Sequence, residues 1–181
     1  MHASGWMDRL SKVRKGKDRF FRDSPQSPIP YQDRDEFEGL RYFPVEPDLR
    51  FELELHEHEE KEPVTVEATG GDQRHVLRWG EFRFVVDGKE RTLQAYRTDP
   101  GADRLFVPFR DATADAETYS LGRYLDLEPQ VHRTDEGTWI LDFNEAYNPW
   151  CAYTDGYSCV VPPDENRLDV PIRAGEKRYE G

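Results

Sequence analysis

The segment HVLRWGEFRFVVDGKERTLQAYR, residues 75–97, predicts two antiparallel strands joined by a tight turn. Apolar and aromatic residues are dense on both sides of Asp87-Gly88, and an Asp-Gly pair between such runs is a strong signal for a two-residue β-hairpin. Gly80 interrupts the first run and predicts a bulge or bend, because glycine weakens regular strand pairing. This hairpin makes a mainly β fold the first expectation for the chain.

Shorter stretches on both sides of the hairpin show the same two-residue period. Apolar and polar side chains alternate in residues 51–55 and 64–68. We expect further strands at residues 105–109, 118–127 and 138–143. Short strands joined by brief turns predict an antiparallel meander, either closed into a barrel or folded into a sandwich.

The two ends of the chain differ from this strand-rich middle. Residues beyond Asn144 lose the two-residue period and combine prolines with aromatic and amide side chains, which predicts a long irregular C-terminal segment. We expect residues 1–24 to form a basic amphipathic helix, packed on or flanking a single mainly β domain of residues 25–181. Residues at helical spacing supply the apolar face of this helix, namely Trp6, Leu10, Val13, Phe20 and Phe21.

The chain is strongly acidic, with 25 Lys or Arg against 37 Asp or Glu and a formal net charge of −12 at pH 7. Such a surface repels nucleic-acid phosphates and anionic lipids, so we expect no nucleic-acid partner. Many carboxylates with few lysines are typical of proteins from salt-loving organisms, in which salt screens the repulsion. We therefore expect halophilic adaptation, which carries no message about function.

Several features bear on where the protein is located. No stretch reaches 18 consecutive apolar residues, which predicts no membrane span, and the first residues lack the pattern of a signal peptide. Two cysteines are too few for a disulfide scaffold and suit a reducing compartment. A cytoplasmic location is the expectation.

Three segments carry a resemblance to a known family: GLRYFPVEPDLRF (39–51), LFVPFRDATADAETYSLGRYLDL (105–127) and LDFNEAYNPWCAYTDGYSCVVPPDENRLDVPIRAGEK (141–177). The chain resembles the domain-of-unknown-function family 1684 over nearly its whole length, as a halophile-like member. One departure is Trp150, where the family more often has a second proline.

The resemblance implies no agreed reaction, cofactor or partner. It does mark the positions that match the family's motifs, among which a site is expected. These positions are Asp111, Thr113, Tyr119, Gly122, Arg123, Asp142, Asn144, Tyr147, Asn148, Cys151, Tyr153, Cys159, Glu165 and Asn166.

Polar residues in these segments predict a pocket for a small polar or anionic ligand. Arginines with interspersed carboxylates and phenols can orient a small anion by bidentate hydrogen bonds. The alternative is that the same residues form ion pairs and caps that tie strands to the C-terminal segment. The candidate ligand-binding residues are Arg110, Asp111, Tyr119, Arg123, Asp142, Asn144, Tyr147, Asn148, Tyr153 and Asn166.

Two other functions compete with ligand binding. Asp142 and Glu165 are candidate catalytic residues of a hydrolase or lyase, with one carboxyl protonated, the other ionised, and Arg123 as an anion clamp. A protein-interaction scaffold that uses the N-terminal helix is the third possibility.

The thiol pair Cys151 and Cys159 predicts either two packed free thiols or a disulfide that closes the loop between them. No histidine lies near them in the sequence, so we expect no metal site. His56 and His58 lie in an acidic run and are interpreted as part of a solvated edge strand. Gly-rich phosphate loops and nucleophile elbows are absent from the sequence, and we expect no cofactor.

Overall fold

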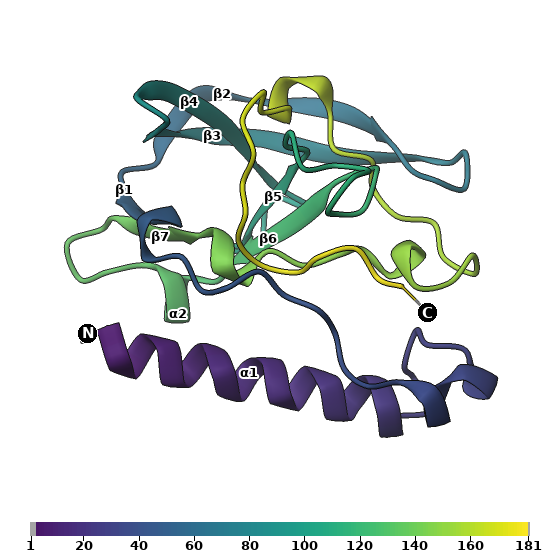
Figure 1. The fold of residues 1–181 in the computed structure, drawn as a ribbon. Coiled ribbons are helices and arrows are strands. Elements are labelled where there is room, and N and C mark those ends of the chain that lie inside the picture. Colours follow the sequence, from purple (N-terminus) through teal and green to yellow (C-terminus); the bar gives the residue numbers. More distant parts are fainter. Residues whose placement is uncertain (1–2, 181) are drawn as a thin grey trace.

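The structure, a computed structural model, describes residues 3–180 and is mostly strand, with one long N-terminal helix (Figure 1). The helices are α1 (Ala3–Asp23) and α2 (Pro129–His132), and the 3-10 helices are η1 (Tyr31–Glu36), η2 (Pro47–Leu49), η3 (Phe143–Glu145), η4 (Trp150–Ala152) and η5 (Asp164–Asn166). The strands are β1 (Arg50–Leu53), β2 (His56–Glu67), β3 (Gln73–Val86), β4 (Lys89–Arg97), β5 (Leu105–Phe109), β6 (Arg123–Leu127) and β7 (Trp139–Asp142).

Five strands form the larger sheet, in the antiparallel order β2-β3-β4-β5-β6. The predicted hairpin joins β3 to β4, and both Asp87 (φ 53°) and Gly88 (φ 74°) have the positive φ that a type I′ turn requires. The predicted irregularity at Gly80 is present as a register shift. A Cβ at this position would lie 2.9 Å from the His56 carbonyl oxygen, so β2 can approach β3 here only beside glycine.

A second sheet consists of β1 and β7, which pair antiparallel. Phe82 and Phe84 of the larger sheet pack with Leu141 and Phe143 of the β7 region, so the main core lies between the two sheets. The prediction of a mainly β, antiparallel fold is confirmed. No barrel closes within residues 3–180, because β2 and β6 are the opposite edges of the larger sheet.

The strand predicted at residues 118–127 is shorter than expected, because β6 begins at Arg123. The preceding residues form a turn in which Thr113 Oγ1 and Thr118 Oγ1 lie 2.9 Å apart. Gly122 has a φ of 111°, and a Cβ there would lie 2.4 Å from the Phe109 carbonyl oxygen. Glycine is therefore needed for the chain to enter β6 beside β5.

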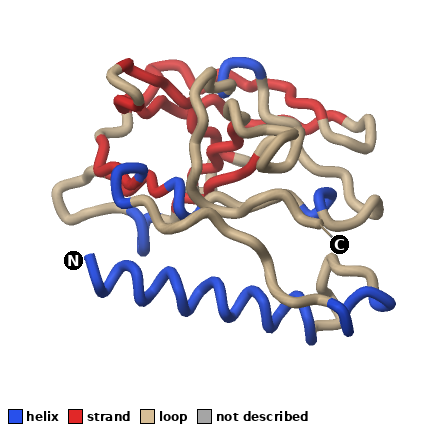
Figure 2. The backbone as a smooth tube through the Cα atoms, in the orientation of Figure 1, coloured by secondary structure: helices blue, strands red, loops and turns tan. Residues whose placement is uncertain are grey.

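The C-terminal segment is irregular, as predicted, and runs as a loop past the strands (Figure 2). Within it the two-residue period returns, because alternate side chains enter the main core. The buried residues of this stretch are Leu168, Val170, Ile172 and Ala174. The sequence interpretation missed this period, although it is visible in residues 168–174.

Helix α1 crosses one side of the molecule, beneath the β1–β7 pair in Figure 1. Trp6, Leu10 and Phe21 are buried, as the predicted apolar face requires. Val13 (62% exposed) and Phe20 (39% exposed) are not buried, so the prediction was wrong for these two residues. The buried apolar contacts of the helix therefore come from Trp6, Leu10 and Phe21, and polar contacts of Arg14 and Lys17 lie between them.

Among residues 3–180, no helix is both long and apolar enough to cross a membrane.

Candidate functional site

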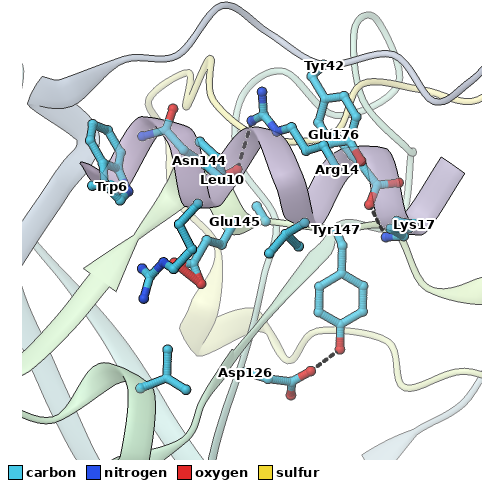
Figure 3. Close-up of a pocket in the computed structure, with 14 residues that line it drawn as sticks. Trp6, Leu10, Arg14, Lys17, Tyr42, Asp126, Asn144, Glu145, Tyr147 and Glu176 are labelled. Carbon is cyan, nitrogen blue, oxygen red and sulfur yellow. Dashed lines mark hydrogen bonds and ion pairs between the residues drawn. The ribbon is translucent and has the colours of Figure 1, made fainter. Parts of the chain in front are cut away.

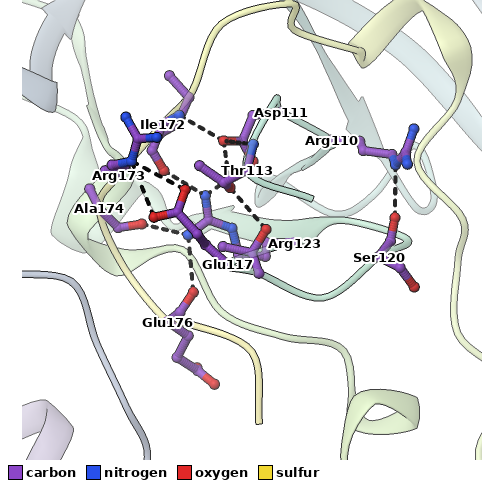
Figure 4. A network of polar contacts seen from close by, with 11 residues as sticks. Arg110, Asp111, Thr113, Glu117, Ser120, Arg123, Ile172, Arg173, Ala174 and Glu176 are labelled. Carbon is purple, nitrogen blue, oxygen red and sulfur yellow. Dashed lines mark hydrogen bonds and ion pairs between the residues drawn. The ribbon is translucent and has the colours of Figure 1, made fainter. Parts of the chain in front are cut away.

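Arg123, at the start of β6, is fully buried in a polar network (Figure 4). Its guanidinium donates hydrogen bonds to the carbonyl oxygens of Ile172 (2.9 Å), Ala174 and Glu176 (3.1 Å). The same group forms an ion pair with Asp111, with 3.3 Å between Nη2 and Oδ1. Burial lowers the pKa of Arg123. The residue therefore ties β6 to the C-terminal segment, and it does not line the cavity described below.

Asp111, the ion-pair partner of Arg123, accepts further hydrogen bonds. Its Oδ2 accepts hydrogen bonds from the Thr113 hydroxyl (2.8 Å) and the Ile172 backbone N–H (2.7 Å). Arg123 Nε is buried and has no hydrogen-bond partner among residues 3–180. Removing one partner of a buried ion pair is costly, because the other charge stays buried without compensation. Two of the predicted ligand-binding residues thus have their hydrogen bonds within the protein.

Asn166 holds the C-terminal segment against β4 and β5, and the Arg110 backbone pairs with the same segment. Asn166 accepts from the Gln94 backbone N–H (2.7 Å) and donates to the carbonyl oxygens of Gln94 (2.9 Å) and Pro108 (2.8 Å). Strands β4 and β5 pair directly only at Tyr96 and Phe106, so this amide completes the hydrogen bonding where the strands have separated. Arg110 Nε donates to the Ser120 carbonyl oxygen at 2.8 Å.

Asp142 and Asn144 lie at the end of β7, where Asp142 contacts Trp6 of α1. Asp142 is 1% exposed; its Oδ2 accepts the Trp6 indole N–H at 2.7 Å, and its Oδ1 accepts the Asn144 backbone N–H at 2.9 Å. Burial raises the pKa of Asp142, and the Asn144 hydrogen bonds oppose that shift. The Asn144 amide also exchanges hydrogen bonds with the Glu46 backbone N–H (2.8 Å) and carbonyl oxygen (2.9 Å).

Glu165, the other candidate catalytic carboxylate, lies in η5, and its side chain is 35% exposed. It forms an ion pair with Arg78 at 3.2 Å and accepts the Tyr96 hydroxyl. Asp142 and Glu165 share no hydrogen-bond partner among residues 3–180. Their use as an acid and base pair stays a prediction.

Tyr119 and the two cysteines meet near η4. The Tyr119 hydroxyl lies 3.4 Å from Cys151 Sγ, and Cys159 Sγ lies 3.4 Å from the Cys151 backbone nitrogen. Both cysteines are free and half-buried. Burial raises the pKa of Tyr119 and of the Cys159 thiol.

A cavity of about 440 Å³ lies between α1 and the rest of the protein (Figure 3). Most of its surface is apolar, with Leu10, Val13, Val131 and Ala146 in the lining. This volume is within the range of small-molecule sites. Of the predicted ligand-binding residues, the structure places Asn144 and Tyr147 in this lining.

Three cations of α1 border the cavity. Lys17 pairs with Glu176, while Arg14 donates to the Asn144 carbonyl oxygen (3.0 Å) and lies over the Tyr42 ring. Arg9 takes part in no ion pair or hydrogen bond among the residues that the structure describes. The helix therefore brings one cation without an ion-pair partner to a cavity whose surface is mostly apolar.

Three carboxylates also line the cavity, and each already has a donor. Glu176 is 1% exposed and accepts the Tyr153 hydroxyl as well as pairing with Lys17. The remaining two pairs are Asp126 with the Tyr147 hydroxyl and Glu145 with His132 Nε2 (2.8 Å). Each carboxylate thus has at least one donor within the protein, whereas Arg9 has no ion-pair partner among the described residues.

Some hydrogen-bonding capacity of the lining residues is unused. Arg14 Nε, Asp126 Oδ1 and Glu145 Oε2 are buried and have no hydrogen-bond partner among residues 3–180. Buried polar atoms without a partner are uncommon in proteins. Asn148, a predicted ligand-binding residue, lies outside the lining; it donates to the Lys177 carbonyl oxygen (3.0 Å), and its Oδ1 has no partner within the same described range.

The sequence interpretation missed the residues that α1 contributes to the cavity. Trp6, Leu10, Val13 and Lys17 follow one another at spacings of four, three and four, which places them on one face of the helix. This signal was visible for the apolar residues, but it could not show that the face covers a cavity. Glu176 was also missed, because nothing in the local sequence shows that it is buried.

No group of three or more His, Cys, Asp or Glu side chains suitable for a metal ion occurs within residues 3–180.

Comparisons with known proteins give a family and a solved relative. Residues 35–177 match the family described as "Protein of unknown function (DUF1684)". The solution NMR structure of an uncharacterised protein from Haloarcula marismortui is similar over 96% of this chain and 95% of that chain, with 42% sequence identity and a TM-score of 0.73. No curated protein matches. The chain belongs to the DUF1684 family of proteins of unknown function.

Proposed function

We propose that the protein binds a small amphipathic molecule, with an apolar body and a polar or anionic group, in the cavity between α1 and the rest of the protein. The observation that carries this proposal is the cavity of about 440 Å³, whose lining is largely apolar and whose positively charged groups all lie on α1. Apolar contacts supply most of the affinity of such sites, and a few polar groups orient the ligand.

The charge of the cavity favours an anionic group. Asp126, Glu145 and Glu176 are each held by a donor of the protein itself, whereas Arg9 has no partner among the described residues. A carboxylate or phosphate near Arg9 would gain a charge-assisted hydrogen bond without displacing an existing ion pair.

Octanoate tests this proposal, because it combines an apolar chain with one carboxylate. We expect a titration followed by ¹H–¹⁵N NMR to shift backbone signals of residues 6–17 and 144–147. Octanol and octylamine, which have the same chain without the negative charge, should bind more weakly. Shifts confined to other regions, or no saturable binding of octanoate, would overturn the proposal.

Arg9→Gln separates the anionic group from the apolar body. We expect this change to weaken octanoate binding by about tenfold and to leave octanol binding unchanged, since one charge-assisted hydrogen bond is removed. Lys12→Gln is the matched control, because Lys12 is an exposed cation of the same helix and does not line the cavity.

We also infer that the acidic composition is an adaptation to high salt. The net charge of −12 supports this inference, as does the similarity to a protein from the halophile Haloarcula marismortui. Screening should reduce the repulsion among surface carboxylates. The melting temperature should therefore rise between 0.1 M and 2 M KCl, and a constant or falling melting temperature would contradict the inference.

A further inference from the structure

We propose that Cys151 and Cys159 are an oxidisable pair that forms a disulfide by exchange with a small organic disulfide such as oxidised glutathione. The two thiols belong to segments that already touch, since Cys159 Sγ lies 3.4 Å from the backbone nitrogen of Cys151. Both side chains are half-buried, so a small reagent can reach them.

The surroundings hold both cysteines in place. Cys151 lies in η4, and its sulfur is 3.4 Å from the Tyr119 hydroxyl. Cys159 is fixed by the turn between β2 and β3, where Thr69 N donates to its carbonyl oxygen (2.9 Å) and its own N–H donates to Thr69 Oγ1 (3.0 Å). Because both backbones are anchored, little conformational entropy of the folded protein is lost when the two sulfurs join.

The exchange proceeds in two steps. A thiolate of one cysteine attacks a sulfur of oxidised glutathione, which forms a mixed disulfide and releases one glutathione thiolate. The second cysteine, after losing its proton to water, attacks the protein sulfur of that mixed disulfide and releases the second glutathione. Two cysteine thiols are thus oxidised, and one glutathione disulfide is reduced to two thiols.

Burial raises the pKa of the Cys159 thiol, and the neighbouring Cys151 side chain adds to this shift. Reaction requires the thiolate, so oxidation should become faster as the pH rises toward that pKa.

The disulfide would join two parts of the molecule. Next to Cys151, the side chains of Trp150 and Tyr153 pack with Phe21, near the C-terminal end of α1. Cys159 is attached to the β2–β3 turn through Thr69. A covalent bond between the cysteines would therefore connect the aromatic cluster that anchors α1 to the larger sheet. This inference does not depend on the proposed ligand.

The test is incubation of the full chain with oxidised glutathione, followed by intact-mass and peptide analysis. We expect a monomer lighter by two hydrogen atoms, with residues 151 and 159 cross-linked. Its melting temperature should exceed that of the reduced protein by roughly 5 °C, as expected for a short closed loop in a chain of this size. A stable glutathione adduct, an intermolecular dimer or unreacted thiols in the wild type would each overturn the proposal.

Single variants test the second step even if the melting temperatures change little. Cys151→Ser and Cys159→Ser should each retain a glutathione adduct, because no second thiol is present to displace it. A matched control combines Cys159→Ser with Ser158→Cys, which moves the thiol by one residue. Ser158 Oγ contacts Gly70 N (3.0 Å) and Asp72, so a thiol there should leave the adduct unresolved. Efficient cross-linking in this control would overturn the geometric basis of the proposal.

Discussion

The Arg123 network and the cavity between α1 and the rest of the protein both contain charged side chains, but these side chains have different surroundings. Arg123 and Asp111 are buried, and their charged groups bond to carbonyl oxygens, to backbone N–H groups and to each other. Around the cavity, an apolar surface remains open and Arg9 has no partner in the described part of the chain. The difference indicates that polar residues in the family's motifs serve the fold in the first region, whereas the second region is where we propose that a ligand binds.

The largest expected effect comes from Arg123→Met. Removing the guanidinium leaves Asp111 as a buried, uncompensated charge and leaves the carbonyl oxygens of Ile172, Ala174 and Glu176 without their donor. We expect a loss of about 3–5 kcal/mol in the free energy of unfolding, measured by urea denaturation. Arg83→Met, at an exposed ion pair, should cost less than about 1 kcal/mol. Equal losses in the two variants would refute the contrast between the regions.

Asn166→Ala should have the next largest effect. The change removes three hydrogen bonds to the backbones of Gln94 and Pro108, at the point where β4 and β5 no longer pair. We expect a loss of about 2–3 kcal/mol in the free energy of unfolding, because buried backbone groups lose their partners. Asp164→Ala, at an exposed position of the same turn, is the control and should change stability little.

Asp142→Asn provides a smaller effect whose size depends on pH. Burial raises the pKa of Asp142 in the folded protein, so its contribution to stability is fully present below its unfolded pKa and is lost as the pH rises through the folded pKa. Asparagine does not titrate. The destabilisation of the variant relative to wild type should therefore be greatest in acid and should shrink toward neutral pH. Urea denaturation of both proteins across this pH range measures the difference, and a penalty that grows with pH would contradict the prediction.

The fold was predictable wherever short-range signals specify it. Asp87-Gly88 and Gly80 specify their turn and bulge through local backbone geometry, and both predictions are confirmed. The start of β6 was not predictable in this way. It depends on the turn between Thr113 and Thr118, which is held in part by the contacts of Asp111 with a distant segment of the chain.

The candidate site was less predictable than the fold. The sequence named Asn144 and Tyr147 as candidate ligand-binding residues, and both line the cavity. It could not show that the Arg123 guanidinium is hydrogen-bonded to carbonyl oxygens more than forty residues away. Helical spacing identified Leu10 and Val13 as one face of α1, yet Val13 is exposed because the helix spans a cavity instead of a packed surface. Tertiary packing decides such outcomes, and no local pattern encodes it.

Filling the cavity tests the central claim most directly. Val13→Trp places a large side chain in the lining, while Ser11→Trp adds the same side chain at an exposed position of α1 that does not line the cavity. We expect Val13→Trp to weaken octanoate binding by about tenfold or more with little change in melting temperature, since Val13 is 62% exposed and contributes little to the core. Ser11→Trp should bind octanoate as the wild type does. Undiminished binding by a folded Val13→Trp protein would contradict the assignment of the site to this cavity.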